Sequence, residues 1–173
     1  AVQCAHLVFG SPKNRVIPDP ADRVLWQQGT DFFRQLGSYA ASRQTVLGME
    51  ANPAIYQTNY INTTKEAIQL IREVASEGFR LNLDTGTMLE NKERVEVLEG
   101  SAALISHVHL SEPFLKPIVT SADRRGFHQE LAAFLREQGY QGYVSVEMGK
   151  SENGVDRLAL LDEILAYGRE MFA

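Results

Sequence analysis

Short apolar runs alternate with longer amphipathic stretches along the whole chain. The runs are apolar almost throughout and end at glycine or polar residues, which is typical of strands that are buried on both faces of a sheet. They predict five strands, at residues 4–9, 45–50, 79–84, 105–110 and 143–148.

The stretches between the runs carry apolar residues at helical spacing. They predict five helices, at residues 20–42, 63–78, 92–98, 127–138 and 155–172. In the first helix we expect an apolar face that includes Val24, Leu25, Phe32, Phe33, Leu36 and Tyr39. In the last helix the expected face is formed by Leu158, Leu161, Ile164 and Leu165.

A strand followed by a helix, repeated five times without a linker, predicts one α/β domain over residues 1–173 with a parallel sheet. An open doubly wound sheet usually has a glycine-rich phosphate turn after an early strand, and Gly10-Ser11-Pro12 does not have that pattern. Barrel enzymes collect polar residues at the carboxyl ends of several strands. Four strand ends are polar here, which favours a (β/α) barrel of the TIM type.

The length is short for a complete barrel. Such a barrel has about 250 residues and eight βα units, whereas this chain has 173 residues and begins at Ala1 without a methionine. An isolated arc would expose two strand edges and an apolar inner face. We therefore expect a partial barrel from the C-terminal part of a longer protein, or a homo-oligomer in which another copy covers the open side.

Composition narrows the class of partner. Seventeen basic and 22 acidic residues give a net charge of −5 without a basic cluster, which argues against nucleic acid as a partner. Neither a membrane-length apolar run nor a signal-peptide pattern is present, and the one cysteine, Cys4, suits a reducing compartment as a small buried side chain. The expected location is cytoplasmic.

Four strand ends carry residues that can bind a metal: Glu50, Asp84, His109 and Glu147. Three carboxylates and one imidazole suit Mn²⁺, Mg²⁺, Co²⁺ or Zn²⁺ without choosing among them. Such an ion polarises a carbonyl or hydroxyl, and a glutamate ligand with a free oxygen can also transfer a proton. The pattern predicts one divalent metal bound jointly by these four side chains.

Other polar residues are weaker candidates for a place in the substrate site. His107 points to the same face as His109 and lies about 6–7 Å deeper, so we expect it on the floor of the site. Lys13 and Arg15 could bind a phosphate or carboxylate, but the pattern favours a solvated loop. His6 is expected in the core and His128 on a solvated helix surface.

The sequence resembles the sugar phosphate isomerase/epimerase family, whose members are xylose-isomerase-like TIM barrels related to the family-2 AP endonucleases. The resemblance rests on four motifs: EANP at 50–53, LDTG at 83–86, HVHLSEP at 107–113 and GYVSVEM at 142–148. It implies that the four strand-end residues bind one divalent metal. It also implies that Glu50 and Glu147 flank the substrate, one removing a proton beside the carbonyl and the other returning it, while the metal holds the enediolate oxygens.

Some positions depart from the family pattern. The family's ketose epimerases often have histidine where Thr87 stands, and an arginine soon after the residue that matches His109, where Leu115 and Lys116 stand here. The further histidines of the nucleases are also missing. Asn52 and Tyr56, in the loop after Glu50, are candidate substrate contacts.

The resulting hypothesis is a metal-dependent isomerase or epimerase of a sugar or keto-polyol, with or without a phosphate group. A lyase of the same family, such as an inosose or dehydroshikimate dehydratase, would share the proton abstraction and then expel water. A truncated barrel that binds a sugar without turnover is the non-enzymatic alternative.

Overall fold

The computed structural model describes residues 4–118, 121–150 and 154–173. The chain forms two compact units. Unit 1 comprises Ala1–Leu83 with Leu104–His107, and unit 2 comprises Asp84–Ala103 with Val108–Ala173. Strands and helices alternate as predicted, and strand β4 (Ile105–Leu110) passes from unit 1 into unit 2.

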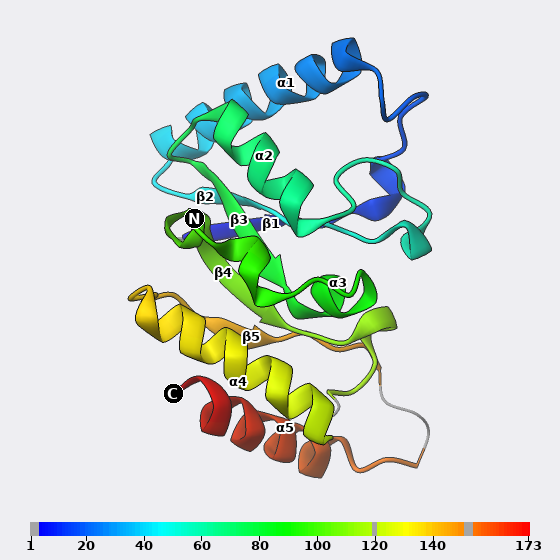
Figure 1. The fold of residues 1–173 in the computed structure, drawn as a ribbon, viewed down its shortest axis with the longest axis vertical. Coiled ribbons are helices and arrows are strands. Elements are labelled where there is room, and N and C mark those ends of the chain that lie inside the picture. Colours follow the sequence, from blue (N-terminus) through cyan, green and yellow to red (C-terminus); the bar gives the residue numbers. More distant parts are fainter. Residues whose placement is uncertain (1–3, 119–120, 151–153) are drawn as a thin grey trace. The chain divides into compact units, whose positions relative to one another are not determined.

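The sheet of unit 1 is formed by β1 (His6–Phe9), β2 (Val46–Met49), β3 (Phe79–Asp84) and the first half of β4, in that order (Figure 1). The pairings of β1 with β2 and of β2 with β3 are parallel. Since β1 lies at the edge of the sheet, Leu7 and Val8 are 46% and 41% exposed. The expectation of a buried first strand was therefore wrong, and Cys4 beside it is exposed as well.

Helix α1 (Arg23–Ser42) packs against α2 (Thr64–Val74) and β2 in unit 1. Asp22 caps α1 by accepting a hydrogen bond from the backbone N–H of Val24 at 2.7 Å. The buried face of α1 is formed by Thr30, Phe33, Gly37 and Ala40. Phe32 and Tyr39, predicted to face the core, are 52% and 60% exposed because the helix turns only the Phe33 side towards Phe79.

A capping box at Thr63 and Glu66 starts α2, as the sequence indicated. The helix ends at Val74, where Ala75 takes a left-handed conformation with φ of 51°, and not at Gly78. Gly78 serves a different purpose, because a Cβ at this position would overlap the backbone of Gly37 in α1.

Unit 2 contains the end of β4, β5 (Val144–Val146) and helices α3 (Thr85–Glu90), α4 (Ala122–Glu137) and α5 (Arg157–Phe172). Strands β4 and β5 are parallel, and α5 packs against β5 and α4. One helix prediction was wrong here, and one helix was missed. The predicted helix 92–98 is only a short 3₁₀ turn, Val95–Leu98, whereas α3 begins directly at the end of β3.

Of the face predicted for α5, only Ile164 belongs to the core of unit 2. Ile164, Tyr167 and Met171 are buried together with Leu110, whereas Leu158 is 76% exposed. His128 of α4, expected in solvent, is fully buried and lies 2.8 Å from the hydroxyl of Tyr167 through Nδ1. These residues of α5 are buried because α4 and β5 pack against the side of the helix that carries them.

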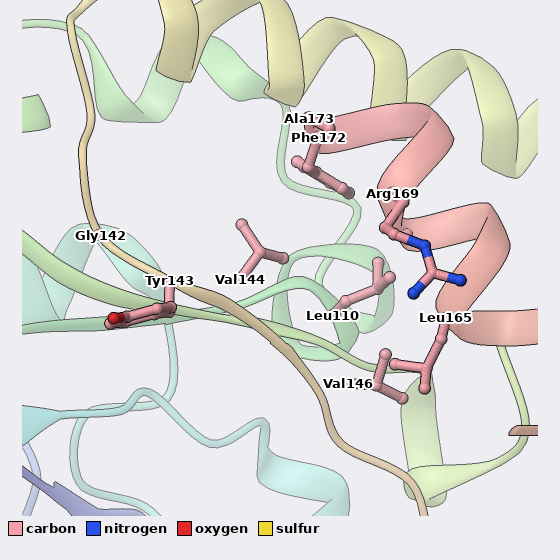
Figure 2. A pocket seen from close by; sticks show the side chains of 10 residues that line it. Leu110, Gly142, Tyr143, Val144, Val146, Leu165, Arg169, Phe172 and Ala173 are labelled. Atoms are coloured by element: carbon pink, nitrogen blue, oxygen red, sulfur yellow. The ribbon is translucent and has the colours of Figure 1, made fainter. Parts of the chain in front are cut away.

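A cavity of about 280 Å³ lies between β5 and α5 in unit 2. Figure 2 shows Val144, Val146 and Leu110 lining it together with Leu165 and Phe172 of the helix. Successive strand residues point to opposite faces. Ser145, and with it Glu147 just beyond the strand, therefore belong to the face opposite this apolar cavity.

One face of the unit 1 sheet is polar. A Cβ on Gly48 would meet His6 at 2.6 Å and Asn82 at 3.1 Å, so these side chains share one face. The ring of His6 stacks on that of His107 at 5.1 Å. Phe79, Leu81 and Leu83 alternate to the opposite face and are buried. The expectation of an apolar inner face was wrong for this unit.

Candidate metal centre

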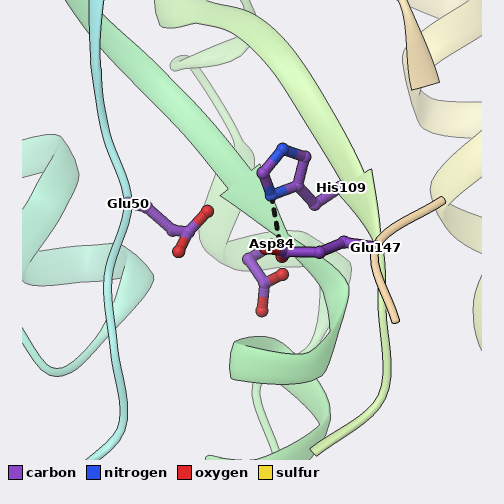
Figure 3. Close-up of side chains that lie close together, drawn as sticks. All are labelled: Glu50, Asp84, His109 and Glu147. Atoms are coloured by element: carbon purple, nitrogen blue, oxygen red, sulfur yellow. Dashed lines mark ion pairs between the residues drawn. The ribbon is translucent and has the colours of Figure 1, made fainter. Parts of the chain in front are cut away.

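Three of the predicted ligands lie together in unit 2. Asp84 ends β3, His109 lies in β4 and Glu147 directly follows β5. Each offers a ligand atom, and these atoms lie within 4.8 Å of one another. Figure 3 draws the three side chains together with Glu50 of unit 1. Parallel strands bring their carboxyl ends to one edge, which is why residues so far apart in sequence meet.

The spacing of His109 and Glu147 suits a common ion. Nδ1 of His109 lies 3.0 Å from Oε2 of Glu147. Imidazole and carboxylate ligands bind a divalent ion such as zinc at about 2.0–2.2 Å, so two neighbouring ligand atoms of one ion are about 3.0–3.5 Å apart. The donor set, two carboxylates and an imidazole, also fits Mn²⁺ or Mg²⁺. A divalent ion therefore fits the residues present.

The contact between His109 and Glu147 also shifts the pKa of Glu147. The hydrogen bond from His109 lowers the pKa of Glu147, and the charge of His109 acts in the same direction, while partial burial opposes both. The side chain of Glu147 is 40% exposed and that of His109 is 14% exposed. Glu147 is consequently an anion at neutral pH that solutes can reach.

Both oxygens of Asp84 are held in place by donors of unit 2. Oδ1 accepts a hydrogen bond from the backbone N–H of Thr87 at 2.6 Å, which makes Asp84 the N-cap of α3. Oδ2 accepts one from the hydroxyl of Ser111 at 2.5 Å, and that hydroxyl in turn accepts the N–H of Gly86 at 2.8 Å. Each carboxylate oxygen has a further lone pair, so the fixed carboxylate can still bind an ion.

Glu50 has its own support within unit 1. It follows β2, is only 6% exposed, and receives one amide donor on each oxygen. Nδ2 of Asn82 donates to Oε2 at 2.6 Å, and Nδ2 of Asn52 donates to Oε1 at 3.2 Å. Gly10 is required beside it, because a Cβ there would lie 2.6 Å from Oε1. The carboxylate is thus oriented by neighbours from one strand and two loops.

Arg15 does not lie in a solvated loop, contrary to that interpretation of the sequence. It is 3% exposed and donates to the backbone oxygen of Glu50 at 2.8 Å and to Oδ1 of Asn52. Burial lowers the pKa of Arg15 to about 10, against the opposing effect of the Glu50 charge. Its neighbour Lys13 is exposed.

The remaining substrate candidates also lie in unit 1. Tyr56 is half-buried in the loop after Glu50, and His107 is half-buried against His6. Their predicted contact with a substrate stays a prediction, as do the roles of Lys13, Arg15 and Asn52.

Sequence reasoning missed Asn82 and Ser111. Both could have been found from strand periodicity. Asn82 is two residues before Asp84 and Ser111 two residues after His109, so each points to the same face as a ligand. A polar residue at that spacing is a candidate support for the ligand it accompanies.

Among the described residues, no helix combines the length and the hydropathy needed to cross a membrane.

Comparison with known proteins identifies relatives of this fold. The model of a family described as the xylose isomerase-like TIM barrel matches residues 1–171. Among curated proteins, no significant match in sequence is found. The predicted fold class, a partial barrel of parallel βα units, is confirmed by this match.

Several solved structures that are described as sugar epimerases are similar to this chain. The 3-keto-D-glucoside 4-epimerase YcjR from E. coli is 25% identical with a TM-score of 0.73, over 95% of this chain and 60% of that protein. An L-ribulose 3-epimerase is 19% identical with a TM-score of 0.77, over 91% and 57%. The D-allulose 3-epimerase from Methylomonas sp. is 20% identical with a TM-score of 0.75, over 97% and 63%. The chain thus spans about three fifths of the length of these proteins.

Proposed function

The chain belongs to the xylose isomerase-like TIM barrel family, and we propose that it carries the metal centre of a divalent-metal-dependent sugar epimerase or isomerase. The observation that carries the proposal is the cluster of Asp84, His109 and Glu147 at three strand ends, with ligand atoms within 4.8 Å of one another. The epimerase structures similar to this chain support the choice of a sugar with a carbonyl group as substrate.

Glu50 is proposed as the fourth ligand. Glu50 directly follows β2, and the other three residues lie at or next to the ends of β3, β4 and β5, so all four share a strand-end position. Its carboxylate is buried and held by Asn52 and Asn82, so its orientation is already set before any ligand binds. A divalent ion held by the four residues would polarise the carbonyl of the substrate.

The two glutamates are proposed as the acid/base pair. One removes a proton from the carbon next to the carbonyl, and the electron pair left behind moves to the carbonyl oxygen. The other returns a proton to that carbon from the opposite side, which inverts its configuration. Glu147 is partly exposed, and its lowered pKa keeps it in the carboxylate form, which is the form that can accept a proton.

The substitution Glu147→Gln tests this proposal. The amide oxygen keeps a neutral metal ligand but cannot exchange a proton, so metal binding should fall modestly while turnover falls about 10²- to 10⁴-fold. Turnover is measured on D-allulose, L-ribulose and 3-keto-glucosides, with solvent deuterium incorporation at the epimerised carbon as a second readout. Glu163→Gln, at an exposed position of α5, is the matched control. Turnover that survives Glu147→Gln unchanged would remove the acid/base assignment.

A further inference from the structure

A buried polar cluster of unit 1 surrounds Glu50. It consists of Arg15 from the loop after β1, Asn52 from the loop after β2, Asn82 of β3 and Glu50 itself. All but Asn82 are candidates from the sequence, in which Arg15 and Asn52 were candidate contacts to a substrate. Their exposures of 3% and 7% place them beneath the surface.

The chemistry of arginine determines how the Asn52 amide is oriented. A guanidinium has donors only, so the Asn52 atom that faces Arg15 must be the acceptor Oδ1. Nδ2 is then directed away from Arg15, and it donates to Oε1 of Glu50 at 3.2 Å and to the backbone oxygen of Ala51 at 3.0 Å. Without Arg15, the amide could rotate and present its oxygen to the carboxylate, which would repel it.

Arg15 is itself firmly held. Its backbone oxygen accepts hydrogen bonds from the hydroxyl of Thr58 at 2.6 Å and from the backbone N–H of Asn59 at 3.3 Å. Its guanidinium also donates to the backbone oxygen of Glu50 and lies 5.9 Å from the centre of the Phe9 ring. Two loops and the end of β2 are therefore joined at one residue.

We propose that Arg15 is a positioning residue, which sets the Asn52 amide and through it the carboxylate of Glu50. The proposal rests on the proposed function of Glu50 as ligand and proton carrier. It assigns Arg15 and Asn52 to the support of Glu50 and removes them from the set of direct substrate contacts.

The substitution Arg15→Lys tests the proposal in the full chain. Lysine keeps the charge but cannot donate to Asn52 and to the Glu50 backbone with the same planar geometry. We expect the side-chain amide ¹H–¹⁵N signals of Asn52 to move towards those of an unbonded amide. Loss of a residue that orients a ligand typically weakens metal affinity about 10- to 100-fold, so Mn²⁺ binding by calorimetry should weaken about tenfold. Turnover should fall through kcat more than through KM.

Arg34→Lys is the matched control. Arg34 also donates to backbone oxygens of unit 1, those of Glu73 and Val74, but it does not belong to the Glu50 cluster. Arg34→Lys should leave the Asn52 signals and the Mn²⁺ affinity unchanged. A purely structural role for Arg15 would give the same result for both variants, a lowered melting temperature with unchanged Asn52 signals and Mn²⁺ affinity, and would overturn the proposal.

Glu50→Gln separates this proposal from the proposed function. If Glu50→Gln binds Mn²⁺ and turns over substrate as the wild type does, the role given to Glu50 fails. The Asn52 amide signals still report whether Arg15 orients that side chain, since they do not depend on metal or substrate. Asn52 signals that do not move in Arg15→Lys would contradict the positioning role whatever Glu50 does.

Discussion

The hydroxyl of Ser111 donates a hydrogen bond to Oδ2 of Asp84 at 2.5 Å. Ser111 is 1% exposed, and its backbone N–H and oxygen are both bonded to the hydroxyl of Thr85, at 2.8 and 2.9 Å. The serine is therefore anchored through its backbone, which leaves its hydroxyl to orient the carboxylate.

We predict that Ser111→Ala weakens divalent-metal binding about tenfold, because groups that orient a ligand typically contribute about 10- to 100-fold to affinity. Mn²⁺ titration by calorimetry measures the effect. Ser106→Ala is the control, since Ser106 lies in β4 but its hydroxyl donates to the backbone oxygen of Leu81 at 3.1 Å. Equal Mn²⁺ affinities for the two variants would show that the Ser111 hydroxyl does not support the centre.

Gly78 should be the glycine of unit 1 least tolerant of a side chain. Its Cβ would overlap the carbonyl oxygen of Gly37 and lie 2.6 Å from the backbone nitrogen of Ala41. Backbone atoms of a helix cannot move aside, so Gly78→Ala should lower the free energy of unfolding by about 1–3 kcal/mol. Urea denaturation measures it.

Gly126 provides a control for which the free energy of unfolding should rise. It lies in α4, and outside the backbone of its own helix no atom is within 4 Å of the position that an alanine Cβ would take. Gly126→Ala should raise the free energy of unfolding by about 0.5–1 kcal/mol, because alanine loses less backbone entropy in a helix. A Gly78→Ala variant as stable as Gly126→Ala would mean that α1 and the Gly78 turn do not approach so closely.

The buried His128 predicts an acid-sensitive unit 2. Burial, together with the charge of Arg124, lowers the pKa of His128 from 6.5 to about 4. Between these values the unfolded chain binds a proton that the folded chain does not, so the free energy of unfolding falls as the pH drops from 6.5 to 4. The loss is at most about 3 kcal/mol, at about 1.4 kcal/mol for each pH unit.

Replacing His128 by Asn isolates this contribution. Asparagine can still bond the Tyr167 hydroxyl but does not titrate. Between pH 4 and 6.5, the free energy of unfolding of the variant should therefore lack the pH dependence that one titrating group contributes. Urea midpoints over this range measure it. Tyr167→Phe keeps the titrating ring and should keep the slope, and a slope that persists in His128→Asn would place the acid sensitivity elsewhere.

The pattern of the sequence was enough to predict the alternation of strands and helices and the candidate ligands at the strand ends. These features depend on local periodicity and on the parallel connection, which brings the carboxyl ends of strands to one edge. Asp84, His109 and Glu147 could be recognised from the sequence for this reason, and their ligand atoms lie within 4.8 Å of one another.

Only the tertiary structure decided which neighbour each side chain has. The pattern of α5 contains two apolar stripes, and the approach of α4 and β5 selected the one with Ile164 and Tyr167. The sequence around Arg15 is typical of a solvated loop, yet in the fold its guanidinium donates to Asn52 and to the backbone oxygen of Glu50. Backbone hydrogen bonding sets a period along the chain, but burial and partners depend on elements that are distant in sequence, and a local pattern contains no information about them.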